Sequence, residues 1–270
     1  MLESSLPPRF RGGQLIPLIG GMTNQSYRLQ LESGRYFLRV GTPMAARVGI
    51  KRRHEMALHL QASRAGLAPA LHFMDVERGL MITDWVTGAE QTADWHTTAG
   101  LQRLAAVLHQ VHTLPVPSCH LDLSAHLYFY LARICLRDGL LKQAFARAQQ
   151  LLAALPPAPA VFCHNDVSPL NLFGAPLQLV DWEYAGAGDA AFDLACACHA
   201  FALDGGQQLQ LLTAYQAKGG VCSGERLDVM RQVADVVALL WARVFAENTG
   251  LAHYDTLYQQ QRQRCQEWLS

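Results

Sequence analysis

The sequence predicts an α+β protein with a small β-rich lobe followed by a larger, mostly helical lobe. Short alternating apolar runs broken by glycine turns occupy the first 84 residues, as is typical of β-hairpins. Apolar residues at helical spacing dominate the rest of the chain. The 270 residues are 50% hydrophobic and 16% charged, which is enough apolar material for a substantial core. We expect one lobe over residues 1–84 and a second over residues 85–270.

The small lobe is expected to contain a hairpin, preceded by a further strand and a glycine-rich loop. A turn at residues 32–34 separates the two alternating runs of the hairpin, and the loop follows an apolar run. After the hairpin the pattern changes to helical and then back to short strands. The predicted strands span 15–19, 26–31, 35–40, 70–74 and 80–83, and the predicted helix spans 51–65.

The larger lobe is expected to begin with helices and to carry a few embedded strands. Prolines at residues 156, 157 and 159 end one helix and favour an extended approach to the next apolar run. Everything from residue 190 onward is consistent with four helices. The predicted helices before it span 100–113, 124–137 and 139–155, and the predicted strands span 161–163, 170–173 and 177–180.

Charge and cysteine content exclude several classes of protein. The 22 basic and 22 acidic residues balance, so no net field attracts nucleic acid or anionic lipid. Seven scattered cysteines without a C-x-x-C pair suit free thiols in a reducing compartment. The start of the chain lacks an apolar signal-like core, and the most apolar stretches are shorter than the roughly 20 residues of a membrane span. We expect a soluble cytoplasmic protein that binds neither nucleic acid nor membrane.

The densest polar cluster lies in residues 164–171 and is followed by Asp181. Apolar strands precede both Asp166 and Asp181, and catalytic groups at strand ends gain rigidity. Phosphoryl transfer needs this set of groups: Asp166 would orient an acceptor hydroxyl, while Asn171 and Asp181 would hold Mg²⁺ on nucleotide phosphates. The alternative is that the carboxylates only cap turns or helices.

The pattern H-x-D-x-x-x-x-N at His164, Asp166 and Asn171, followed by Asp181, resembles the protein-kinase-like fold. The similarity is to the branch of aminoglycoside phosphotransferases, choline kinases and thiamine kinases. It implies a bilobal fold that uses ATP and Mg²⁺, with a nucleotide-binding first lobe and a catalytic, substrate-binding second lobe. It also implies supporting roles: His164 would hold the loop, and Asp193 would bind its backbone. Asp189 would do similar work or cap a helix.

The resemblance assigns further nucleotide-binding residues in the small lobe. Glycines allow backbone amides to approach phosphates closely. Arg39 takes the place of the strand lysine of protein kinases, and Glu55 would be its partner; a surface ion pair is the alternative. The segment after the last strand would meet the adenine. The candidate residues of the loop and of this hinge are Gly20, Gly21, Thr23, Asn24, Thr83 and Trp85.

The acceptor is expected to be a small alcohol that carries a positive charge, of the choline or thiamine type. Aromatic faces and a nearby carboxylate suit such a cation. The candidates are Trp182, Glu183, Tyr184 and Trp241, with core packing as the alternative for Trp241. Other acceptors remain open (ethanolamine, homoserine, a sugar or an aminoglycoside), as does a non-catalytic nucleotide-binding module. The sequence leaves open the oligomeric state and the preference for ATP over GTP.

Overall fold

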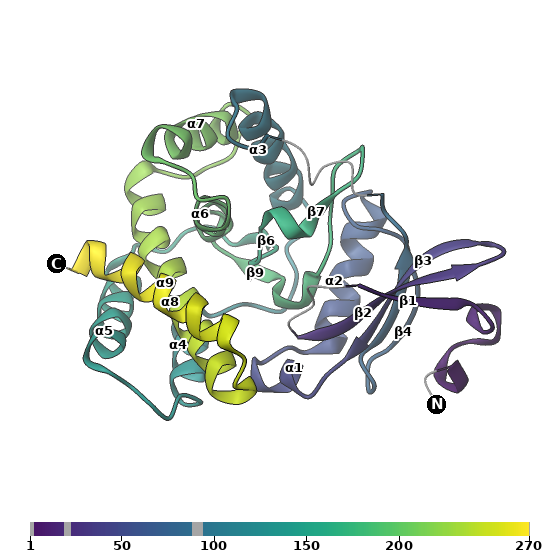
Figure 1. Ribbon diagram of the computed structural model, residues 1–270. Helices are drawn as coiled ribbons and strands as arrows, with labels where there is room; N and C mark the ends of the chain where they lie inside the picture. Colours follow the sequence, from purple (N-terminus) through teal and green to yellow (C-terminus); the bar gives the residue numbers. More distant parts are fainter. Residues whose placement is uncertain (1–2, 19–22, 88–93, 270) are drawn as a thin grey trace. The chain divides into compact units, whose positions relative to one another are not determined.

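The computed structural model describes residues 3–18, 23–87 and 94–269, and Figure 1 shows the order of the elements along the chain. The chain forms two compact units, which are described separately below. Unit 1 comprises Met1–Thr92 together with Asn171–Glu183. Unit 2 comprises Ala93–Leu170 together with Tyr184–Ser270. Asp166 therefore lies in unit 2, whereas Asn171 and Asp181 lie in unit 1.

Unit 1 is built on a five-stranded antiparallel sheet with the strand order β1-β2-β3-β5-β4. The five predicted strands are all present, each within two residues of its expected ends. Register places Arg39 of β3 opposite Ser26 of β2 and Met81 of β5, in the centre of the sheet. The strands are β1 (Gln14–Leu18), β2 (Asn24–Leu31), β3 (Gly34–Gly41), β4 (Leu71–Asp75) and β5 (Leu80–Asp84).

One face of this sheet carries the hydrophobic core of unit 1. Leu38 and Ile82 pair across β3 and β5 and are fully buried. Phe10, from the segment before β1, packs into the same cluster. The predicted helix is α2 (Arg52–Arg64), which contacts β4. A further short helix, α1 (Met44–Arg47), has no counterpart among the predicted elements.

The segment Asn171–Glu183 adds a small hairpin to unit 1. Strand β7 (Leu172–Phe173) pairs with β8 (Gln178–Leu179), and the Leu179 N–H donates to the Leu67 carbonyl at 2.8 Å. Both strands are shorter than predicted, and a 3-10 turn, Pro169–Asn171, replaces the start of the first. A second 3-10 turn, Trp182–Tyr184, follows the hairpin.

Unit 2 is mostly helical, with one two-stranded ribbon of β6 (Val161–Cys163) and β9 (Gly186–Gly188). The four helices expected after residue 190 are confirmed. Strand β9 was not predicted, since a Gly-Ala-Gly segment carries no strand signal. The helices are α3 (Thr98–His112), α4 (Leu123–Leu131), α5 (Gly139–Ala154), α6 (Ala190–Ala200), α7 (Gly205–Gln216), α8 (Gly224–Thr249) and α9 (Ala252–Leu269).

Helix α4 ends at Leu131, whereas the periodicity predicted a helix to residue 137. The chain beyond it bonds to α8 instead of continuing the helix. Backbone N–H groups of Cys135 and Leu136 donate to the Glu247 carboxylate at 2.7 and 2.9 Å. These bonds to a charged acceptor replace the helical ones.

The core of unit 2 surrounds α6, whose residues are buried on nearly every side. Helices α3 and α8 pack against it, and α9 runs along α8 (Figure 1). Strand β6 contacts both α3 and α6 and leads directly into His164. In the described part of the chain, no helix combines the length and the apolar character needed to cross a bilayer.

Candidate active site

Arg39 and Glu55 form a buried ion pair in unit 1. Both nitrogens of the Arg39 fork donate to the Glu55 carboxylate, and the Nη2–Oε2 distance is 2.9 Å. The two residues are 2% and 1% exposed, so the alternative of a surface ion pair does not hold. Burial is the largest influence on each group and opposes its charge. The charges and hydrogen bonds of Arg39 and Arg52 together still lower the pKa of Glu55. Likewise Glu55, with smaller contributions from Asp181 and Glu183, raises the pKa of Arg39.

Arg52 is a second guanidinium in this cluster. Its Nη1 donates to Glu55 at 2.8 Å and to Glu183 at 3.0 Å, and its Nη2 donates to Asn24 Oδ1 at 2.5 Å. A single rigid fork therefore connects three acceptors from three segments of the chain. Sequence reasoning did not single out Arg52. Its only local signal is its position three residues before Glu55 on one helix.

Among the described residues, the donors that bind Glu183 belong to unit 1. Besides Arg52, it accepts the Thr23 hydroxyl at 2.8 Å and the Asn24 amide at 3.1 Å, and its side chain is 2% exposed. The Thr23 carbonyl in turn accepts the Thr42 hydroxyl at 2.6 Å. The structure thus places Glu183 against Thr23 and Asn24, the two candidate residues of the predicted glycine loop that it describes. Both carboxylate oxygens are engaged there.

Asp181 and Asn171 flank the β7–β8 hairpin. The Val180 N–H donates to the Asn171 carbonyl at 2.9 Å, so the hairpin holds the two candidate metal ligands at its open end. Asp181 adopts a left-handed conformation with φ of 65°, and its side chain is 34% exposed. Its Oδ1 lies 3.6 Å from Arg39 Nη1.

The donor set around Asp181 fits a hard divalent cation. One oxygen each of Glu55, Asp181 and Glu183 lie within 4.8 Å of one another. Arg39 and Arg52 supply two positive charges against these three negative ones, and Asp181 is the carboxylate that reaches solvent. Carboxylate and amide oxygens are the ligands that Mg²⁺ prefers. The residues present are therefore suited to hold Mg²⁺ through Asp181 and Asn171.

The loop that carries Asp166 lies in unit 2 and is held by Asp193. The fully buried carboxylate of Asp193 accepts the His164 N–H at 2.8 Å and the Asn165 N–H at 2.6 Å. Asn165 has φ of 64°, and its side-chain amide donates to the Tyr184 carbonyl at 3.0 Å. The Asp166 N–H donates to His164 Nδ1 at 3.3 Å. Neighbouring groups thus hold Asp166 on a loop with an unusual backbone conformation.

Asp189 caps helix α6. Its Oδ1 accepts the Ala191 N–H at 3.0 Å, and its Oδ2 pairs with the Arg226 guanidinium at 2.5 and 2.6 Å. Of the two roles left open by the sequence, these contacts correspond to the helix cap. The ion pair ties the start of α6 to the start of α8.

The aromatic candidates lie in three different surroundings. Trp182 is fully buried in unit 1, and its indole N–H donates to the Leu179 carbonyl at 2.9 Å, so it packs in the core of this conformation. Tyr184 is half-buried in unit 2, with its hydroxyl 3.5 Å from that of Tyr130. Trp241 is half-buried and lies against Phe245, with ring centroids 4.1 Å apart.

The remaining nucleotide candidates lie at the end of β5, an interior strand of the sheet, or outside the described residues. Gly20 and Gly21 belong to the segment 19–22, which the structure does not describe. Thr83 is buried on β5, one residue before the strand ends. Trp85 follows directly, half-buried, with the Arg28 guanidinium 5.8 Å from the ring centroid.

Comparison with known proteins shows which family the chain belongs to. Residues 14–233 match the profile of the APH phosphotransferase enzyme family. Protein LicA of Haemophilus influenzae is 25% identical over 189 residues, which cover 66% of this chain and only 55% of LicA. The choline kinase LicA from Streptococcus pneumoniae is similar in structure, with a TM-score of 0.80 and 20% identity over 95% of this chain and 93% of that one.

A crystal structure of LicA in complex with AMP has a TM-score of 0.79 and 18% identity, over 99% of this chain and 96% of that one. At such identities the structural likeness shows the protein-kinase-like fold. The family profile covers most of the sequence. The chain therefore belongs to the APH phosphotransferase enzyme family.

Proposed function

We propose that this protein is an ATP- and Mg²⁺-dependent kinase that transfers the γ-phosphate to the hydroxyl of a small cationic alcohol. The proposal rests mainly on the buried Arg39–Glu55 pair with Asp181 beside Arg39. A fixed guanidinium suits bidentate contact with phosphate oxygens, and a partly exposed carboxylate next to it suits the metal of a nucleotide.

Each candidate residue of unit 1 then has a defined role. Arg39, oriented by Glu55, would bind the nucleotide phosphates, and Asp181 and Asn171 would hold Mg²⁺. The bound metal would neutralise charge on the transferred phosphoryl group. Backbone amides of the glycine loop would contact the phosphates, and the end of β5 would meet the adenine. The loop and hinge residues proposed for this are Gly20, Gly21, Thr23, Asn24, Thr83 and Trp85.

Asp166 would accept the proton of the acceptor hydroxyl and orient its oxygen toward the phosphorus. The His164 and Asn165 N–H groups donate to Asp193. These bonds support the role of Asp166 because they fix the backbone that carries it. A carboxylate in a defined position contributes more to the rate than a mobile one.

A cationic acceptor is supported by the ring cluster around Tyr184. The His126 ring contacts those of Tyr130 and Tyr184, with centroid distances of 4.4 and 6.1 Å. Burial lowers the pKa of His126 to about 4, so the ring is neutral at pH 7 and does not repel a cation. Aromatic faces attract quaternary ammonium groups. Because LicA from Streptococcus pneumoniae is a choline kinase, we propose choline first, with ethanolamine and thiamine next.

A substrate panel tests the proposal. Purified protein with ATP and Mg²⁺ is offered choline, ethanolamine, thiamine, homoserine, a neutral sugar and an aminoglycoside, and ADP release is compared with the rate without acceptor. We expect a marked increase with a cationic alcohol. Activity on only a neutral acceptor would contradict the proposed substrate class. Nucleotide-dependent thermal stabilisation without any product would indicate a binding module instead.

The mechanism is tested with Asp166→Asn. We expect this variant to lose turnover by at least about 10²-fold, the usual contribution of a positioned base, while nucleotide binding is retained. Asp228→Asn is the matched control, because Asp228 is an exposed carboxylate of the same unit that pairs with Arg231 one turn away. Full turnover in Asp166→Asn would refute the mechanism.

A further inference from the structure

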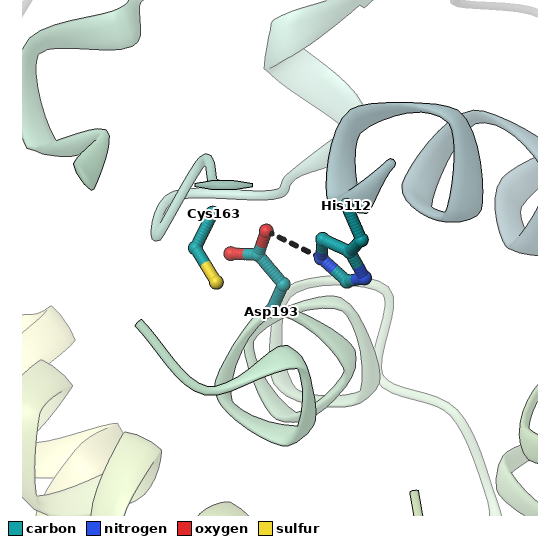
Figure 2. Close-up of side chains that lie close together, drawn as sticks. All are labelled: His112, Cys163 and Asp193. Carbon is teal, nitrogen blue, oxygen red and sulfur yellow. Dashed lines mark hydrogen bonds and ion pairs between the residues drawn. The ribbon is translucent and has the colours of Figure 1, made fainter. Parts of the chain in front are cut away.

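A buried chain of hydrogen bonds in unit 2 extends the contacts of Asp193 to two further helices. His112, at the end of α3, places Nε2 3.1 Å from Asp193 Oδ2 (Figure 2). Its other ring nitrogen, Nδ1, lies 2.7 Å from the hydroxyl of Tyr215 on α7. The exposed fractions are 7% for His112, 2% for Tyr215 and 0% for Asp193, so water does not compete for these bonds.

The direction of the bonds follows from the groups themselves. Burial raises the pKa of Tyr215, so its hydroxyl stays protonated and can donate to His112 Nδ1. With Nδ1 as the acceptor of this bond, Nε2 is the nitrogen that carries a proton and donates to Asp193. Tyr215 therefore selects the tautomer that supplies Asp193 with a third donor, beside the His164 and Asn165 N–H groups.

The same residues could be mistaken for a metal site, because donor atoms of His112, Cys163 and Asp193 lie within 4.8 Å of one another. However, each oxygen of Asp193 already accepts a backbone N–H. Burial, followed by the charge of Asp193, raises the pKa of Cys163, so the thiol remains protonated. Metal ligation by cysteine requires the thiolate. The arrangement in Figure 2 is a hydrogen-bonded support.

We propose that His112 and Tyr215 are positioning residues for the catalytic loop, acting through Asp193 on the backbone that carries Asp166. This inference rests on the role proposed above for Asp166. Neither residue needs to touch substrate. Their contribution is to keep the Asp193 carboxylate in the one orientation that binds both loop amides.

The conformation of the loop explains why such a support is needed. Asn165 has a positive φ, which residues other than glycine adopt rarely and at a cost. The Asn165 N–H bond to Asp193 Oδ1 is one of the contacts that hold it there. If His112 no longer donates, the buried carboxylate loses one of its donors and rotates to compensate. The shift passes to Asn165 and then to Asp166, and small misplacements of a catalytic group reduce kcat strongly.

A pair of variants of similar size tests the donor. His112→Gln keeps an amide N–H that can reach Asp193, whereas His112→Met has similar length and no donor. We expect His112→Met to lower kcat by roughly 10- to 100-fold with KM for the nucleotide little changed, the pattern of a misplaced catalytic group. His112→Gln should recover most of the loss. Equal kcat losses in both variants would refute the proposal.

Tyr215→Phe tests the second link without altering core volume. We expect a smaller loss of kcat, because the imidazole remains but its tautomer is no longer fixed. Tyr258→Phe is the matched control: the Tyr258 hydroxyl is a buried donor of the same unit that binds Asp138 at 3.0 Å, away from the loop. It should lower the melting temperature and leave kcat unchanged. Equal effects of the two variants on kcat would indicate a merely structural role for Tyr215.

Hydrogen exchange separates this inference from the proposed function. Amide exchange at His164 and Asn165 reports the two bonds to Asp193 and needs no acceptor. Exchange there should be faster in His112→Met than in His112→Gln or Tyr258→Phe. Faster exchange in a protein that phosphorylates no acceptor would refute the proposed function and retain the support of the loop. Unchanged exchange in His112→Met would overturn the support itself.

Discussion

Two buried carboxylate clusters in this protein are stabilised in different ways. In unit 1, Glu55 and Glu183 face the guanidinium groups of Arg39 and Arg52. In unit 2, Asp193 is bound by two backbone N–H groups and the imidazole of His112. One cluster compensates charge with charge, and the other uses hydrogen-bond donors of the loop and of a neighbouring helix.

The difference matches what each cluster is proposed to do. The cluster of unit 1 must present positive charge to phosphates, so its acids keep the arginines in place and leave Asp181 for the metal. Asp193 supports a backbone rather than a ligand, and fixed dipoles suffice for that purpose. Removing one partner of a buried ion pair leaves an uncompensated charge, which costs more than losing one hydrogen bond.

The largest effect is expected from Glu55→Gln, which removes the charge between Arg39 and Arg52 at nearly constant size. Two buried guanidinium groups then lose their shared partner, and the free energy of unfolding should fall by about 3–5 kcal/mol in urea titrations. Nucleotide binding should weaken as well, since Arg39 loses its orientation.

Glu77→Gln is the control for Glu55→Gln. Glu77 pairs with Arg53 at 3.0 Å, but both side chains are more than three-quarters exposed. Exposed pairs contribute little to stability, so this variant should unfold at the wild-type urea concentration. If the two variants lost equal stability, the cluster of unit 1 would not depend on charge pairing.

A smaller loss of stability is expected from Asp193→Asn. The asparagine oxygen can still accept one loop N–H, but its amide group then faces the other donor. One unsatisfied buried donor predicts a loss of about 1–3 kcal/mol. Turnover should fall more than this loss of stability implies, because the loop that carries Asp166 is released. A loss of stability larger than that of Glu55→Gln would reverse the comparison.

The sequence predicted the pairs whose members are close along the chain better than those that are distant. Arg39 and Glu55 follow from one strand and the next helix, and the structure brings them together. Arg52 and Glu183 are separated by 131 residues, and no local pattern indicates that a loop acid will return to that helix. His112 occupies an ordinary apolar-face position of α3, where periodicity cannot distinguish a packed histidine from a hydrogen-bonding one.

The sequence also could not predict the roles of single aromatic residues. Trp182 follows Asp181, the proposed metal ligand, as a ligand-binding ring could, yet it is fully buried and its indole N–H donates to the Leu179 carbonyl. A pattern of residue types does not report which face of a tight turn a ring occupies. The same limit applies to the end of α4, which the distant Glu247 determines.

His126 differs from the groups of both carboxylate clusters, because burial alone keeps this titratable ring neutral. Its pKa is about 4 in the folded protein, below the ordinary value near 6.5, so the unfolded chain takes up a proton first as the pH falls. Stability should therefore decrease between pH 6.5 and 4 and not increase again below that range. Because the ring is only partly buried, we expect about 1 kcal/mol from this residue.

Unfolding in urea at pH 7, 6 and 5 measures this contribution. His126→Phe retains an aromatic ring beside Tyr130 and cannot titrate, so its stability should depend less on pH than that of the wild type. A parallel pH profile for His126→Phe would show that the pKa of His126 is not lowered in the folded protein. In that case burial would not keep the ring neutral, and His126 would no longer support the proposed cationic acceptor.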